Sequence, residues 1–365
     1  MATPLPRLKK DRVAGTFYQT AKYVRWWDGE ELRCEHKLDV KKCGDCIGLK
    51  AVTAIAPRLP PPIQLPTTIL PILSNHWPAL IIHPSTATVI PGVKTNSVTS
   101  KYRVSHKIGQ GSFGTVYLGA NSESNERVAI KVEERNCKVP QLQYEYEVYT
   151  RIPPAIGVPQ VYTIAKNSKV HLMVMELLGD DLETQYNKLG RVFTLAQIKY
   201  IGTQMISRVE YYHSQGTLHR DIKPDNFVYG SPHGEHAKTL YLIDLGISKR
   251  WKTSSSEHIP YREGRSPVGT QRYMSLNVHM GYEPSRRDDV ESVGLVLLYF
   301  IHGRLPWQGL KNDKTKVLEK HASTPLDVLC GKAPMQFIEY ISYCRTLKFE
   351  SKPDYAYLRR LIERM

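Results

Sequence analysis

A polar loop in the stretch "TLHRDIKPDNFVYG", residues 217–230, carries three side chains that suit phosphoryl transfer. Transfer to a hydroxyl needs a carboxylate to orient that hydroxyl, a cation beside the moving phosphoryl group and an oxygen ligand for a metal ion. Asp221, Lys223 and Asn226 supply these groups in order. His-Arg-Asp triplets also arise by chance, and Pro-Asp-Asn is ordinary turn chemistry. The loop alone therefore leaves both interpretations open.

A glycine-rich segment precedes this loop in the chain. The stretch "IGQGSFGTVYLG" places Gly109, Gly111 and Gly114 between two runs of strand-forming residues. Glycines at such a turn let backbone N–H groups approach phosphates closely. The same spacing followed by a helix would indicate a dinucleotide fold, but "TVYLGAN" has the composition of a strand, which favours a loop over the phosphates of ATP.

A lysine follows in the third run, "VAIKVE". Lys131 could reach the α- and β-phosphates, and Glu145 on the next predicted helix could hold it by an ion pair. An exposed strand lysine is the alternative, which the apolar residues on both sides of Lys131 argue against. Glu147 lies on a different helical face from Glu145, so we favour Glu145 as the partner.

A carboxylate follows the strand in "LIDLGISK". Mg²⁺ prefers oxygen ligands, and Asp244 together with Asn226 provides two. An aspartate in a turn after a strand is common, so the order and spacing after the first loop give this motif its weight.

The elements expected to position these groups change in character along the chain. From Lys101, short β-branched and aromatic runs predict an antiparallel sheet of about five strands, with a helix in "VPQLQYEYEVYTRI". After residue 180 the apolar spacing becomes helical, and "DDVESVGLVLLYFIHG" is apolar nearly all round, as in a buried helix. We predict an α+β fold with two lobes, residues 101–178 and 179–365, and a site between them.

Composition sets broader limits. The 365 residues, 41% of them hydrophobic, suffice for one large domain and an appendage. There is no apolar window long enough for a membrane span and no secretory signal, so we expect a monomer of the cytoplasm or the nucleus. The net charge of +15 favours acidic partners, which include phosphoproteins and nucleic acid.

The first hundred residues divide into two parts. Residues 1–50 are basic and contain cysteines, and residues 51–100 carry nine prolines, as in a linker. The stretch "RCEHKLDVKKCGDC" could hold one tetrahedral Zn²⁺ in a small partner-binding module, or it could carry free thiols in a largely irregular segment. The candidate ligands are Cys34, His36, Cys43 and Cys46.

Together the motifs make the chain resemble a eukaryotic protein kinase. Over residues 101–365 it is similar to the casein kinase 1 family, through "QMISRVEYYHSQGTLHRDIKPDNF", "HIPYREGRSPVGTQRYMSLNVHMGYEPSRRDDVESVG", "LPWQGLK" and "KPDYAYLRRL". That family has Ser-Ile-Asn after its activation segment in place of the usual Ala-Pro-Glu. Ser275, Leu276 and Asn277 correspond to it here.

The resemblance implies a role for each matching position. Asp221 would be the catalytic base, Lys223 would stabilise charge on the transferring group, and Asp289 would brace the catalytic loop. Met175 would be the gatekeeper, and Glu176 and Leu178 would bind adenine through their backbones. The apolar walls of the ATP site would be Ile108, Val116, Ala129, Val228 and Ile243.

The resemblance also implies protein substrates that are acidic or already phosphorylated, and no nucleic acid. Arg272 matches a key position of the family's anion site, Arg262 lies nearby in sequence, and Lys314 or Lys316 could replace a further lysine. Arg265 fits a solvated surface charge as well as it fits the anion site. The segment "GLKNDKTKVLEKHASTP" is about five residues shorter than the family pattern, which puts a preference for primed substrates in doubt.

The expected activity is transfer of the γ-phosphoryl group of ATP, with Mg²⁺, to serine or threonine. Leu245 stands where the family has Phe, and we expect this apolar side chain to pack there without loss of activity. The chain ends at "LRRLIERM", so we expect constitutive activity without an autoinhibitory tail. The alternative is a pseudokinase scaffold that binds acidic partners, and the combined presence of Lys131, Asp221, Asn226 and Asp244 argues against it.

Overall fold

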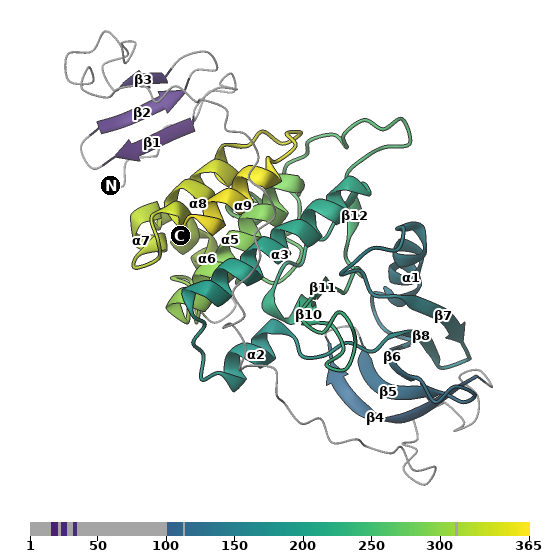
Figure 1. Ribbon diagram of the computed structural model, residues 1–365. Coiled ribbons are helices and arrows are strands. Elements are labelled where there is room, and N and C mark those ends of the chain that lie inside the picture. The colour runs from purple at the N-terminus through teal and green to yellow at the C-terminus, as the bar shows by residue number, and fades with distance from the viewer. Residues whose placement is uncertain (1–15, 21–22, 28–31, 35–100, 112–113, 311–312) are drawn as a thin grey trace. The chain divides into compact units, whose positions relative to one another are not determined.

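The computed structural model describes residues 16–20, 23–27, 32–34, 101–111, 114–310 and 313–365 (Figure 1). The chain divides into two compact units, Met1–Ile72 and Leu73–Met365. The predicted domain limits at residues 50 and 100 lie outside the described residues and stay predictions.

The N-terminal unit contains a small antiparallel sheet. Its order is β1 (Thr16–Thr20), β2 (Tyr23–Trp27) and β3 (Leu32–Cys34), so that the middle strand pairs with both others. The sequence analysis assigned no strands here. The β-branched and aromatic residues of "TFYQT" and "YVRWW" are good strand formers, but runs of five residues give a weak signal without a visible partner.

The N-terminal lobe of the larger unit is built on a five-stranded antiparallel sheet. The strand order is β4-β5-β6-β8-β7, in agreement with the predicted sheet. The strands are β4 (Tyr102–Gln110), β5 (Thr115–Asn121), β6 (Arg127–Glu134), β7 (Val161–Lys166) and β8 (Val170–Glu176). The central strand β6 carries Lys131 and pairs with β5 on one side and with β8 on the other, so the backbone at Lys131 is held from both sides.

One helix, α1 (Leu142–Arg151), connects β6 to β7 and packs against the edge of the sheet formed by β7 and β8. The helix buries Leu142, Glu145, Val148 and Tyr149. Three of these are apolar and one is a carboxylate, and a carboxylate tolerates burial only with partners. Its partner is Lys131 of β6.

The C-terminal lobe is mainly helical (Figure 1). Its longest helices are α3 (Leu195–Ser214) and α5 (Arg286–His302), which pack against each other. The predicted face of α3 is buried, because Ile198, Ile201, Met205, Val209 and Tyr212 are all at most 1% exposed. The remaining helices are α2 (Leu182–Lys188), α4 (Leu276–His279), α6 (Lys314–Ser323), α7 (Leu326–Cys330), α8 (Gln336–Thr346) and α9 (Tyr355–Glu363).

The centre of this lobe is α5, as its apolar sequence predicted. Its residues from Val293 to Phe300 are buried all round, packed by α3 on one side and α8 on another. At the start of the helix Oδ2 of Asp288 accepts from the backbone N–H of Ser285 at 2.7 Å, and the helix ends at Gly303, whose φ of 77° suits a residue without a side chain. A helix fixed at both ends in this way is a rigid base for the loops packed on it.

Short strands frame residues 219–226, the loop that the sequence predicted to be catalytic and that is called the catalytic loop below. They pair as β9 (Thr217–Leu218) with β12 (Lys249–Arg250) and as β10 (Phe227–Tyr229) with β11 (Leu240–Leu242). Between β9 and β10 the chain makes a single 3₁₀ turn at Pro224–Asn226. None of the helices described here is long and apolar enough to span a membrane.

Candidate active site

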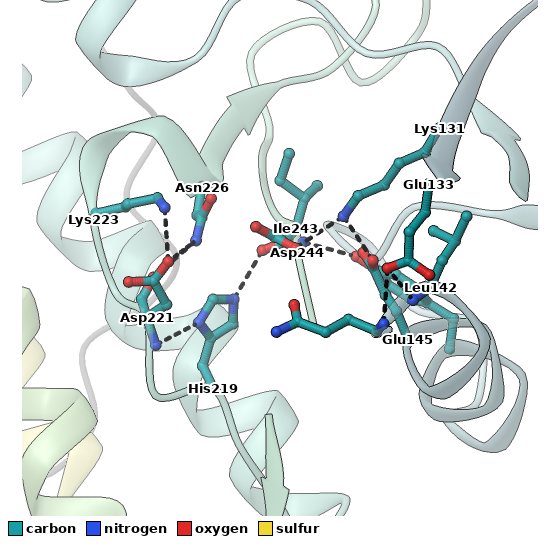
Figure 2. Close-up of polar contacts among 12 residues, drawn as sticks. Lys131, Glu133, Leu142, Glu145, His219, Asp221, Lys223, Asn226, Ile243 and Asp244 are labelled. Atoms are coloured by element: carbon teal, nitrogen blue, oxygen red, sulfur yellow. Dashed lines mark hydrogen bonds and ion pairs between the residues drawn. The ribbon is translucent and has the colours of Figure 1, made fainter. Parts of the chain in front are cut away.

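An ion pair joins β6 to α1 and reaches the C-terminal lobe. The Nζ atom of Lys131 lies 2.6 Å from Oε2 of Glu145 and 2.9 Å from Oδ1 of Asp244. Burial alone would lower the pKa of Lys131, but the two carboxylates outweigh it, so that its pKa lies above the ordinary value. The amine therefore stays charged at neutral pH, and Figure 2 shows it between the two acids. Glu147 is exposed and bonds to Gln143 within the helix.

The backbone at Asp244 is held in an unusual conformation. Its φ is 67°, which is uncommon for any residue other than glycine, and its N–H donates to the hydroxyl of Tyr149 on α1 at 3.1 Å. Leu245 is fully buried in the main core, so the leucine packs here as expected. Burial raises the pKa of Asp244, but Lys131 outweighs this effect and holds it below the ordinary value. The strained turn thus presents an ionised carboxylate beside the lysine.

Four hydrogen bonds converge on one carboxylate of the catalytic loop. Oδ2 of Asp221 accepts from Nζ of Lys223 at 2.7 Å and from Nδ2 of Asn226 at 3.4 Å. Oδ1 accepts from the hydroxyl and the backbone N–H of Thr270, at 2.7 and 2.8 Å. These bonds fix the orientation of a side chain that is only 7% exposed. A carboxylate fixed in this way can orient an incoming hydroxyl.

The loop is braced from α5, as the resemblance implied. Asp289 accepts from the backbone N–H groups of His219 and Arg220 at 2.8 and 2.9 Å, and from Nε2 of His213 at 2.8 Å. Burial would raise the pKa of Asp289, but the hydrogen bond from His213 and the other donors hold it below the ordinary value. Arg220 has a φ of 69°, so this bracing supports a backbone conformation that the loop alone would not favour.

The residues present fit a nucleotide and a divalent cation. A Cβ atom at Gly114 would lie 2.4 Å from the carbonyl oxygen of Val132. Only glycine therefore allows the glycine-rich loop to approach the backbone of β6 this closely. The N–H of Leu178 makes no hydrogen bond to the described residues, and it is a donor suited to adenine. Asn226 Oδ1 and Asp244 Oδ2 also accept none from those residues, and both are hard oxygen ligands. A bound Mg²⁺ would neutralise charge on the phosphates.

The predicted apolar walls come from both lobes. Ala129 and Val228 are buried, Met175 is 8% exposed, and Ile108 is 39% exposed on β4. The register pairs Ala129 with Met175 across β6 and β8, so this part of the wall is one surface. Val116, Ile243 and the Glu176 side chain are partly buried.

The three predicted anion-site cations differ from Arg265 in their partners. Arg262, Arg272 and Lys314 form no ion pair with a carboxylate of the described residues, whereas Arg265 lies 3.5 Å from Glu283. The guanidinium of Arg272 lies over the rings of Tyr273 and Tyr299, with distances of 5.6 and 5.7 Å to the centroids. Arg262 and Lys314 are exposed. Lys316, the alternative to Lys314, pairs with Asp313 at 3.3 Å.

Sequence reasoning missed two residues of the site. Thr270 follows Asp221 by 49 positions, and no local motif announces that the two will meet. Glu133 lies beside Lys131 in "VAIKVE" and bonds to the first turn of α1. Alternation along a strand placed Glu133 on the same face as Lys131, and this was the available signal.

The predicted zinc ligands stay untested. Cys34 ends β3, and the other three candidates, His36, Cys43 and Cys46, lie outside the described residues. Within the described residues there is no group of three or more His, Cys, Asp or Glu side chains placed to hold a metal ion.

A comparison with known families agrees with this geometry. The family model described as protein kinase domain matches residues 102–346, which include β4 to β8, the catalytic loop and most of the helical lobe. A kinase of this family transfers a phosphoryl group from ATP with Mg²⁺ to a protein. The match covers well over half of the chain and contains all the residues discussed above from Lys131 to Asp289, and on this ground the chain belongs to the protein kinase family.

Proposed function

We propose that the protein is a serine/threonine kinase of the casein kinase 1 type, acting on acidic or previously phosphorylated protein segments. The observation that carries the proposal is the ordered catalytic carboxylate of Asp221, held by Lys223 on one oxygen and by Thr270 on the other. Asp221 orients the substrate hydroxyl, and Lys223 stabilises charge on the group in transfer. Lys131, positioned by Glu145, aligns the phosphates.

The proposal includes activity without phosphorylation of the activation segment. Arg220 donates from Nε to the carbonyl of Ile247 at 2.7 Å and from a terminal nitrogen to the carbonyl of Ser248 at 3.3 Å. Tyr144 of α1 donates to the same Ser248 carbonyl at 3.0 Å. Backbone carbonyls thus occupy the arginine that could otherwise bind a phosphate on this segment. This arrangement supports constitutive activity.

The substrate preference rests on the unpaired cations. Arg272 stacks on two tyrosine rings, which restrict its guanidinium, and no described carboxylate neutralises it. A restricted guanidinium binds phosphate or carboxylate oxygens by two parallel hydrogen bonds. Arg262 and Lys314 add exposed positive charge. The preference for an acidic or phosphorylated residue near the acceptor follows from these three side chains.

The first experiment measures phosphate transfer from labelled ATP with Mg²⁺. The substrates are an acidic peptide with a serine acceptor, the same peptide with a phosphorylated residue near that serine (its phosphorylated twin), and a version with tyrosine as the acceptor. We expect transfer to serine, faster for the phosphorylated twin, and none with Asp221→Asn. The Arg272→Gln variant should lose the preference for the twin while it retains transfer to the unphosphorylated peptide.

The matched control for Arg272 is Arg265→Gln, because Arg265 is already paired with Glu283. This control should keep the preference for the twin. Transfer to tyrosine alone would refute the serine/threonine assignment. Equal rates on the two serine peptides by the wild type would refute the anion site and leave the kinase assignment standing.

A further inference from the structure

An acidic residue of β6, Glu133, contacts the start of α1. Oε1 of Glu133 accepts from the backbone N–H of Gln141 at 2.7 Å and from that of Leu142 at 3.1 Å. Figure 2 shows Glu133 beside Glu145, with its carboxylate turned toward Leu142. A side chain of the sheet therefore binds the first N–H groups of the helix.

Among the described residues, the backbone N–H groups of Gln141 and Leu142 have no other acceptor. The first turn of a helix leaves its N–H groups without carbonyl acceptors, and the residue before the helix commonly supplies a side-chain oxygen. Gln141 occupies that position and makes no such bond. Glu133 replaces it from another element, and its negative charge is favourable at the positive end of the helix dipole.

The carboxylate of Glu133 is buried and committed to this contact. Glu133 is 2% exposed, and its second oxygen lies 3.9 Å from Nδ1 of His171 on the facing strand β8. That oxygen has no hydrogen bond of its own. Burying a charge in this way is costly unless the remaining bonds are strong. A glutamate placed here only to fill space would be a poor choice.

The turn that Glu133 holds also contains Glu145. The N–H of Glu145 donates to the carbonyl of Gln141 at 2.8 Å, which closes the first turn of α1. Alternate residues of a strand share a face, so Lys131 and Glu133 both project from β6 toward this turn. The strand thus binds the helix at two points, through Lys131 to Glu145 and through Glu133 to the backbone of residues 141 and 142.

We propose that Glu133 is a positioning residue for phosphoryl transfer. By fixing the first turn of α1, it places Glu145 where Glu145 can hold Lys131 in line with the phosphates. The inference rests on the proposed kinase activity. It makes the glutamate two residues after the phosphate-binding lysine part of the device that keeps α1 in its active position.

Three substitutions of Glu133 separate the effect of side-chain length from the effect of charge. Glu133→Ala removes the acceptor, Glu133→Asp keeps the charge but is one methylene too short, and Glu133→Gln keeps an acceptor oxygen at the original length. We expect kcat to fall about tenfold or more for Ala and Asp, and by less than about threefold for Gln. The matched control is Glu134→Ala, which removes an exposed carboxylate from the next position of the strand.

A double-mutant cycle with Glu145→Gln shows whether Glu133 acts through Glu145. In the Glu145→Gln background, Glu133→Asp should lower kcat by less than about twofold, because the pair that it positions is already lost. A full tenfold loss in both backgrounds would overturn the proposal and leave Glu133 with a purely structural role. The Asp variant carries this test even if the Ala variant does not fold.

Amide hydrogen exchange provides a readout that does not depend on activity. Exchange at Gln141 and Leu142 should accelerate in the Ala and Asp variants and stay slow in Gln and in Glu134→Ala. Unchanged exchange in the Asp variant would show that Glu133 does not hold the start of α1, whatever the value of kcat. If the wild-type protein transfers no phosphate but exchange is accelerated in the variants, the proposed function and the positioning role of Glu133 in phosphoryl transfer are refuted. The contact of Glu133 with the start of α1 would still stand.

Discussion

Lys131 on the sheet and Asp244 on the loop after β11 meet at 2.9 Å between Nζ and Oδ1, although 113 positions separate them in the chain. This contact joins the two lobes at the point where the phosphates of ATP are expected. Lys131 is also bound to Glu145, so one amine connects strand, helix and loop. The groups that would carry the chemistry therefore also connect the two lobes to each other.

The first prediction concerns this amine. Lys131→Met should lower kcat by about 10²–10³, because it removes a preorganised positive charge from the transferring phosphates. The measurement is kcat at saturating ATP. The control is Lys169→Met in the exposed turn between β7 and β8, which should change kcat by less than about twofold. Comparable losses in both variants would contradict the assigned role of Lys131.

The second prediction concerns the hydroxyl that orients Asp221. Thr270→Ala removes the 2.7 Å bond to Oδ1 but leaves the backbone N–H of residue 270 in place. We expect kcat to fall about tenfold with little change in the KM for ATP, since the loss affects orientation of the base. Thr270→Ser keeps the hydroxyl and should recover most of the rate. If Thr270→Ser is as slow as Thr270→Ala, the hydroxyl of residue 270 does not orient Asp221 for catalysis.

The third prediction concerns the brace beneath the catalytic loop. Asp289→Ala would leave two buried backbone N–H groups and His213 without their acceptor. We expect a loss of about 3–5 kcal/mol in the free energy of unfolding, measured by urea denaturation. Glu319→Ala on the exposed face of α6 should change it by less than about 0.5 kcal/mol. A similar small change for Asp289 would show that the loop does not depend on the brace.

The fourth prediction concerns a buried histidine pair in the helical lobe. Nδ1 of His279 on α4 lies 2.9 Å from Nδ1 of His321 on α6, and Nε2 of His321 lies 3.0 Å from a guanidinium nitrogen of Arg345. The guanidinium can only donate, so His321 is protonated at Nδ1 and donates to His279. Trp307 stacks on His321 at 3.8 Å between ring centroids. Both histidines are neutral in this arrangement.

The sign of the pH dependence follows from burial. Burial lowers the pKa of His279 to about 4 from its ordinary value of 6.5, and burial with the nearby Arg345 lowers that of His321 as well. Between these values the unfolded chain binds a proton that the folded chain does not bind. The free energy of unfolding therefore falls as the pH drops from about 6.5 toward 4, by about 3 kcal/mol for His279 alone.

Urea denaturation at about pH 7.5 and about pH 5 measures the part of this loss that occurs above pH 5, about 2 kcal/mol for His279. The decrease should be smaller in His279→Asn than in the wild type, because the variant cannot take up the proton in either state. His233→Asn, at an exposed position, should behave like the wild type. An equal decrease in the wild type and His279→Asn would assign the acid sensitivity to other groups.

The kind of chemistry and the element types could be predicted from local patterns in the sequence. The spacing of Gly109, Lys131, Asp221 and Asp244 indicated phosphoryl transfer, because each group serves that reaction through its own local motif. Short β-branched and aromatic runs likewise predicted the five-stranded sheet. Apolar residues at spacings of three and four predicted the buried face of α3, and a sequence that is apolar nearly all round predicted the buried helix α5. These are short-range signals, and they survive folding because packing acts on whole faces of an element.

Which side chains hold the catalytic ones in place depends on how the folded chain packs. Thr270 on Asp221 and Glu133 on the start of α1 join segments that no local period relates. The positive φ of Arg220 and Asp244 also exists only because packed neighbours support it. A hydrogen bond requires atoms placed within tenths of an ångström, and that placement comes from the packing of both lobes together.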